Sequence, residues 1–158
     1  QFPRDDLTYW GLEYRTWGIL LFAISILAII AVFQRARSPG LVALATALSV
    51  MAFFVFLTRM HERYLFPFFL PFLAACVLTR SRILWASFAV LGVIHFFNLY
   101  YVYSYYNDNS LRWDPLWDWI GKQDTIFWSS LITLLAFPAL LLVSVLLCRR
   151  EAEEPEPA

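Results

Sequence analysis

The sequence predicts an all-α fold: a polytopic membrane helix bundle with about five transmembrane helices and one short interfacial helix. Of the 158 residues, 61% are hydrophobic and only 15% are charged, whereas about 25% of the residues in an ordinary soluble domain are charged. The apolar residues form five long runs separated by short charged breaks. Five such runs in succession favour membrane helices over the core helices of a soluble protein.

The five apolar runs cover residues 17–33, 41–57, 64–78, 83–103 and 126–147. A helix needs about 20 residues, with a range of about 17 to 25, to cross the hydrocarbon core of a bilayer. The first two runs are at the short end of that range, and the last two are comfortably long. The third run is short and contains Pro67 and Pro71, so it is the least secure of the five predicted helices.

The charged breaks predict which helix ends share a side of the membrane. In every second break, the charged residues that precede the acidic tail are all basic. They are Arg35 and Arg37, Arg80 and Arg82, and Arg149 and Arg150. Short cytoplasmic loops are enriched in Lys and Arg, so these breaks are predicted to be cytoplasmic. The twelve Lys and Arg residues divide equally between the two sides, and the prediction therefore depends on the absence of acids from the short loops.

By composition the chain divides into three parts. Residues 1–16 form an extracytoplasmic interfacial strip, residues 17–148 a transmembrane helical domain, and residues 149–158 an acidic cytoplasmic tail. From Glu151 onward the tail alternates Glu with Pro and Ala, which predicts a solvated, structureless end with no role of its own. The aromatic start, without a signal-peptide pattern, suggests the C-terminal part of a longer protein.

The loop at residues 107–124 contains signals for a short helix. Asp114 is a suitable N-cap, Pro115 suits the first helical position and Gly121 can end the helix. Three tryptophans lie around it, at positions 113, 117 and 119. A short Trp-rich helix of this kind is typical of the membrane interface. It is either a plain aromatic belt or a lid or rim over a lipid-facing site.

Composition and spacing argue against several classes of function. Because 12 Lys and Arg residues balance 12 Asp and Glu residues, a nucleic-acid binder of the usual basic kind is not expected. His61 and His95 are far apart in sequence, Cys76 and Cys148 lie at predicted cytoplasmic helix ends, and no metal site or other cofactor is predicted. Neither a Gly-rich phosphate loop nor a nucleophile elbow is present.

The strongest candidate site is the turn at residues 59–63, named the 59–63 turn below. Arg59 and Arg63 could hold a phosphate through several N–H donors. His61 could donate a hydrogen bond to that phosphate or move a proton, and Glu62 could orient either neighbour. Ionisable groups beside hydrocarbon are costly and tend to mark sites. The plainer interpretation is an interfacial turn whose arginines reach lipid headgroups.

Helical spacing predicts how these side chains are distributed. In a continuous helix, one face would carry Arg59, Glu62 and Arg63, and the other would carry His61, Tyr64 and Leu65. Pro67 cannot donate a backbone hydrogen bond to the carbonyl of Arg63, which favours a break or a helix start. A break would allow both sets to converge on one ligand.

Residues 59–67, Arg-Met-His-Glu-Arg-Tyr-Leu-Phe-Pro, resemble the MHERYLFP signature of bacterial and archaeal GT-C glycosyltransferases. They are also similar to the His-Glu-Lys motif of eukaryotic glucosyltransferases that use dolichyl-phosphate glucose. Beyond this motif the resemblance is one of hydropathy. It implies that His61 and the two arginines contact the phosphate of a polyprenyl-phosphate sugar donor, with Glu62 positioning them, on the extracytoplasmic side.

The sequence departs from that family in one respect. The family's catalytic base is an aspartate in the first extracytoplasmic loop of a chain with many more helices. Asp5 and Asp6 lie on the predicted side but precede the first helix, and a solvated loop end is their plainer interpretation. The catalytic residue is therefore unknown, and the chain is expected to hold a donor-binding part without the part that activates the acceptor.

A second candidate set lies in the fourth apolar run. His95 and Asn98 are three residues apart and share a helical face, and Tyr105 follows near the end of the run. The two open interpretations are a hydrogen bond between helices and a lining of the same cavity as His61. The aromatic residues from 96 to 106 are otherwise typical of an interfacial belt.

Two functions follow as expectations. The first is the C-terminal membrane portion of a GT-C glycosyltransferase in a prokaryotic plasma membrane, acting in the cell envelope. The second is a non-catalytic integral membrane subunit that packs against partner chains and binds lipid through Arg59 and Arg63. The expected partners are the lipid-linked donor, membrane lipid, and an N-terminal half or other membrane subunits. An upstream reading frame with an acidic first loop would favour the enzyme.

Overall fold

The computed structural model describes residues 8–34, 36–57, 62–106 and 112–153. It confirms the all-α prediction, with a single two-stranded hairpin before the first helix in the described part. In chain order the elements are β1 (Thr8–Tyr9), β2 (Leu12–Glu13), α1 (Tyr14–Phe33), α2 (Pro39–Phe56), the 3-10 turn η1 (Glu62–Leu65), α3 (Phe66–Thr79), α4 (Arg82–Tyr106), α5 (Asp114–Ile120) and α6 (Gln123–Glu153).

Four of these helices, α1, α2, α4 and α6, are long and apolar enough to cross a membrane. They indicate an integral membrane protein, as the composition predicted. The third predicted run corresponds to α3, which is apolar but has only 14 residues. At 1.5 Å per residue it is about 21 Å long, less than the roughly 30 Å of a hydrocarbon core. With η1 directly before it, this segment is one turn longer.

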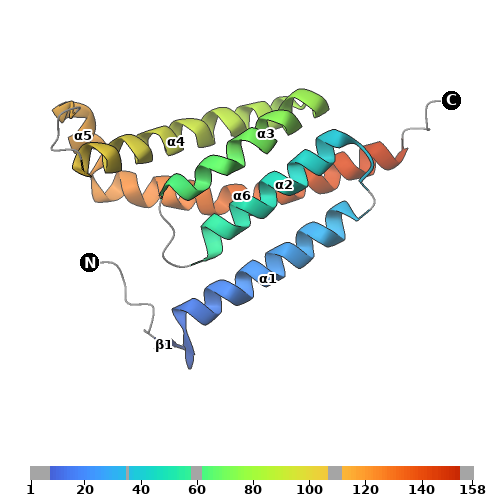
Figure 1. Ribbon diagram of the computed structural model, residues 1–158, viewed down its shortest axis with the longest axis horizontal. Helices are drawn as coiled ribbons and strands as arrows, with labels where there is room; N and C mark the ends of the chain where they lie inside the picture. The colour runs from blue at the N-terminus through green and yellow to red at the C-terminus, as the bar shows by residue number, and fades with distance from the viewer. Residues whose placement is uncertain (1–7, 35, 58–61, 107–111, 154–158) are drawn as a thin grey trace.

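The centre of the bundle is the pair α2 and α3. Their facing side chains are fully buried and include Leu48 and Met51 of α2 and Phe68 and Phe72 of α3. Helices α1 and α6 pack against α2, and α4 packs against α3 (Figure 1). At Gly40 a Cβ atom would lie 2.9 Å from Cγ2 of Thr79. Because residue 40 has no side chain, the start of α2 can lie this close to the end of α3.

The helix ends gather at two opposite ends of the bundle (Figure 1). One end, called the basic end, contains the end of α1, the start of α2, the α3–α4 connection and the end of α6. The other, called the aromatic end, contains the β-hairpin, the end of α2, η1, the end of α4 and α5. The three basic breaks therefore share one end, as alternation along the chain requires. That the basic end faces the cytoplasm stays a prediction from the charge pattern.

Glu151 links the end of α6 to the α1–α2 turn at the basic end. Its Oε1 accepts hydrogen bonds from the backbone N–H groups of Arg37, at 3.1 Å, and Ser38, at 2.6 Å, and its Oε2 accepts one from the Ser38 hydroxyl at 3.2 Å. Helix α6 continues to Glu153. The prediction of a structureless tail from Glu151 is thus wrong for residues 151–153, because this carboxylate finds donors on a turn more than a hundred residues away.

Replacing Glu151 by Ala should lower the free energy of unfolding by about 1–2 kcal/mol, since three hydrogen bonds to a charged acceptor are lost from a partly exposed site. The measurement is denaturant unfolding of the protein in mixed micelles. Glu153→Ala is the matched control, because Glu153 is an exposed acid on the same last turn of α6. Equal losses in the two variants would mean that Glu151 only contributes charge.

Helix α5 confirms the predicted short helix, with a different start. Trp113 is the N-cap residue, while Asp114 is the first helical residue, and its Oδ1 lies 2.7 Å from Nε of Arg112. Pro115 lies in the first turn as expected. Gly121 caps the end with φ −72°, so the helix stops without a left-handed residue. The placement of α5 in the membrane interface stays a prediction.

Helix α5 is held on α4 by aromatic contacts. The ring of Trp117 stacks on Tyr101, with centroids 4.8 Å apart, and the guanidinium carbon of Arg112 lies 4.1 Å from the Trp117 centroid. The Tyr100 hydroxyl accepts the backbone N–H of Trp113 at 2.7 Å. These contacts fix α5 beside the end of α4.

Candidate functional site

In the chain, the 59–63 turn lies between α2 and α3, and the end of α2 and the start of η1 both lie at the aromatic end of the bundle. Arg59 and His61 lie outside the described residues. Glu62 and Arg63 begin η1, where the structure describes their backbone. Of the next two residues, Leu65 is 4% exposed and belongs to the core, while Tyr64 is exposed. Leu65 thus anchors η1 in the bundle.

Local chemistry explains why the chain forms a 3-10 turn here. Pro67 occupies the first turn of α3, and it has no N–H group to bond back to the carbonyl of Arg63. An α-helix running unbroken through residues 63–67 is therefore unfavourable, and a short 3-10 turn precedes α3 instead. The predicted break or helix start at Pro67 is confirmed.

The register of α3 against α4 shows what lies beside η1. Helices α3 and α4 are antiparallel neighbours, and the Phe69 ring of α3 contacts Phe88 and His95 of α4. η1 precedes Phe69 by one to two helical turns, and it packs against α4. Moving back along α3 means moving forward along α4, so η1 lies near the turns of α4 that follow His95. The fold therefore brings η1, with the backbone of Glu62 and Arg63, into the same region as His95.

His95 is the most unusual polar residue of this region. It is 6% exposed, and its ring stacks on Phe69 with centroids 5.0 Å apart and an interplanar angle of 29°. Its Nε2 atom has no hydrogen-bond partner among the described residues. A buried polar atom without a partner costs free energy and requires an explanation, such as a ligand or a water molecule.

Asn98, three residues further along α4, is exposed. His95 and Asn98 lie on neighbouring parts of the helix surface, as their spacing predicted, but Phe69 covers only the histidine. Tyr105 is also exposed. An amide on the outside of a spanning helix is expected to meet protein or water, so Asn98 stays a candidate for contact with a partner or ligand beside η1.

Sequence reasoning missed the role of Phe69, which carries no polar group to suggest a site. It treated residues 1–16 only as an aromatic strip, although Tyr9 and Tyr14 help to line a groove at the aromatic end. Among the described residues, no group of three or more His, Cys, Asp and Glu side chains could hold a metal ion. No family model, curated protein or solved structure matches this chain.

Proposed function

We propose that this chain is the C-terminal membrane portion of a glycosyltransferase of the GT-C type, which uses a polyprenyl-phosphate-linked sugar donor. The observation that carries the proposal is the residue pattern at positions 59–67, which falls on a break between two helices of a membrane bundle. The nearby buried His95, with a ring nitrogen that lacks a described partner, supports a ligand site in this region.

The chemistry of transfer explains the residue types. An acceptor hydroxyl forms a bond to the anomeric carbon of the sugar, the bond from that carbon to the phosphate oxygen breaks, and the hydroxyl proton passes to a base. The departing lipid phosphate gains negative charge as this happens. Arg59 and Arg63 would stabilise that charge, and His61 would donate a further hydrogen bond. In this proposal, another part of the enzyme supplies the base.

The proposed orientation puts the aromatic end and the N-terminal strip outside a prokaryotic plasma membrane, with the C-terminus in the cytoplasm. A variant without Cys76 and Cys148 can carry a single new cysteine at Lys122 or at Glu153, which are exposed at opposite ends. Lys122→Cys should react with an impermeant maleimide in intact cells, whereas Glu153→Cys should react only after lysis. Labelling of both positions from the same side would refute the orientation.

The second candidate, a non-catalytic subunit, is favoured by the outer surface of α1. Only 17% of the apolar window of α1 is buried, and large side chains such as Ile24 and Leu27 are exposed. This surface would suit helices of a partner chain as well as lipid. Direct donor binding separates the two functions, because a packing subunit has no need to recognise a sugar phosphate.

The test uses the full chain in nanodiscs and a short-chain polyprenyl-phosphate sugar, with the corresponding neutral polyprenol as the control ligand. The proposal expects saturable binding of the phosphate-linked sugar and much weaker binding of the polyprenol. Equal binding of the two would show that only the hydrocarbon chain is recognised, and the enzyme proposal would fail.

A further inference from the structure

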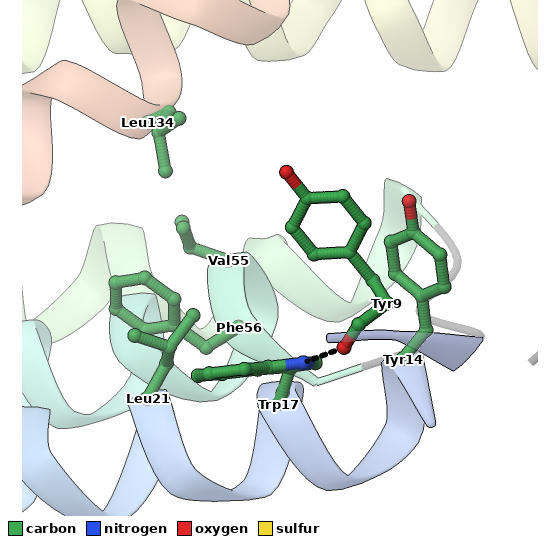
Figure 2. Close-up of a pocket in the computed structure, with 8 residues that line it drawn as sticks. Tyr9, Tyr14, Trp17, Leu21, Val55, Phe56 and Leu134 are labelled. Atoms are coloured by element: carbon green, nitrogen blue, oxygen red, sulfur yellow. Dashed lines mark hydrogen bonds between the residues drawn. The ribbon is translucent and has the colours of Figure 1, made fainter. Parts of the chain in front are cut away.

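A groove opens at the aromatic end between the start of α1, the end of α2 and the middle of α6. It has a volume of about 320 Å³. In Figure 2, the Trp17 ring lies along one side of it, Leu21 and Phe56 lie next to that ring, and Leu134 of α6 lies across from them. Among the described residues, its walls are almost entirely apolar.

Polar atoms are confined to the rim of this groove. The rings of Tyr9 and Tyr14 stand side by side with their hydroxyls directed away from the Trp17 ring (Figure 2). Nε1 of Trp17 donates to the carbonyl of Tyr9 at 3.0 Å, so this indole N–H is already used. Neither tyrosine hydroxyl has a hydrogen-bond partner within residues 8–34, 36–57, 62–106 and 112–153.

The β-hairpin holds Tyr9 at this rim. Trp10 and Gly11 both have positive φ, 54° and 79°, as a two-residue turn between antiparallel strands requires. This turn folds the chain back beside the start of α1, where the hydrogen bond from Trp17 fixes Tyr9. The two phenol groups therefore have a defined place, built by the hairpin and the first turn of α1.

The groove extends from the helix ends toward the middle of the bundle. Leu21 follows Tyr14 by seven residues on α1, which places it about 10 Å further along the helix axis. Because α1, α2 and α6 have the length and apolarity of spanning helices, this direction leads into the hydrocarbon layer. The groove thus has hydrogen-bond donors at the interface and apolar walls below them, which is the polarity of a lipid molecule.

The size of the groove limits what can occupy it. A space of about 320 Å³ that reaches about 10 Å along the helices is smaller than the same length of an α-helix with its side chains, which is about 10–12 Å across. A whole helix of another chain therefore does not fit inside it, and apolar walls offer water no partners. An empty groove would lose van der Waals contacts along its whole lining. A single hydrocarbon chain is the occupant that fits.

We propose that the groove binds one acyl chain of a membrane glycerophospholipid, whose phosphate accepts hydrogen bonds from the hydroxyls of Tyr9 and Tyr14. Inside a bilayer, apolar burial gives a lipid little preference for protein over other lipids. The retention of this lipid depends instead on the two phenol donors and on the fit of the chain. The proposal does not depend on the donor-binding role of the 59–63 turn.

The experiment measures the phospholipid that stays bound to the full-length chain after detergent exchange, by native mass spectrometry. Tyr9→Phe with Tyr14→Phe keeps both rings and removes both hydroxyls, so retained phospholipid should fall about tenfold or more. Tyr105→Phe is the matched control, because Tyr105 is an exposed tyrosine outside the groove, and it should leave retention unchanged. Equal retention in the double variant and the control would overturn the proposal.

A second measurement identifies the occupant and does not need the tyrosine variants. A phospholipid with a photoactivatable group on its acyl chain should label the groove residues Leu21 and Val55 in the wild-type protein. Leu134→Trp should reduce that labelling by narrowing the groove, whereas Leu142→Trp, on an exposed part of the same helix, should not. Uniform labelling of all exposed apolar residues would contradict the proposal. So would a polyprenyl lipid, or a second copy of the chain, retained in the groove.

Discussion

Replacing Arg63 by Ala is expected to weaken binding of the polyprenyl-phosphate-linked donor by about 1.5–3 kcal/mol, the range for hydrogen bonds to charged groups. This corresponds to a roughly 10- to 150-fold higher dissociation constant. The reason is that a guanidinium at the edge of the hydrocarbon layer can bind a phosphodiester through two parallel N–H donors. Arg59→Ala is expected to have an effect in the same range.

Two further variants make this prediction specific to the 59–63 turn. Arg63→Lys should recover only part of the loss, because an ammonium group keeps the charge without the planar pair of donors. Arg82→Ala is the matched control, since Arg82 begins α4 at the basic end of the bundle. If Arg82→Ala weakens binding as much as Arg63→Ala does, the arginines act only through general attraction of anions.

The second large effect is expected at His95, where stability and function should change in opposite directions. His95→Phe keeps a ring that can stack on Phe69 and removes the Nε2 atom that has no described partner. The free energy of unfolding should rise by about 1–3 kcal/mol, because the cost of burying that atom disappears. Sugar transfer by the complete protein should fall if this nitrogen contacts the donor or a water molecule beside it.

The two readouts for His95 are unfolding in mixed micelles and turnover of the complete enzyme. Val93→Phe is the control for adding a ring to α4, since Val93 is exposed on that helix and should change neither quantity appreciably. A less stable His95→Phe variant would mean that the histidine is satisfied by groups in the remainder of the chain. Unchanged turnover would remove His95 from the site.

The extent of each helix shows where sequence patterns were sufficient and where they were not. The apolar run at 64–78 was expected to be α-helical from its first residue, but Tyr64 and Leu65 belong to η1, and α3 begins at Phe66 with Pro67 in its first turn. Helix α6 runs to Glu153, well beyond the apolar run that ends at residue 147. Backbone hydrogen bonds do not require apolar side chains, so hydropathy underestimated this helix.

The candidate site was predictable only in part. The residue types of the 59–63 turn are visible in the sequence because ionisable groups between two apolar runs are rare. Its neighbourhood is not visible, because η1, Phe69 and His95 come together through the packing of α3 on α4. The spacing of His95 and Asn98 predicts a shared face, but it carries no information about which of them a neighbouring helix covers.

The membrane bundle, the order of its helices and the clustering of the basic breaks at one end were predictable from the residues alone, because hydropathy, helix length and short connections act locally along the chain. The packing of the helices was needed to show that His95 is buried under Phe69, that Glu151 binds the α1–α2 turn and that Tyr9 stands at a groove lined by Leu134. Each of these contacts joins different elements of the bundle. Their formation depends on how side chains of different helices fit together, and no local pattern in a single sequence encodes that fit.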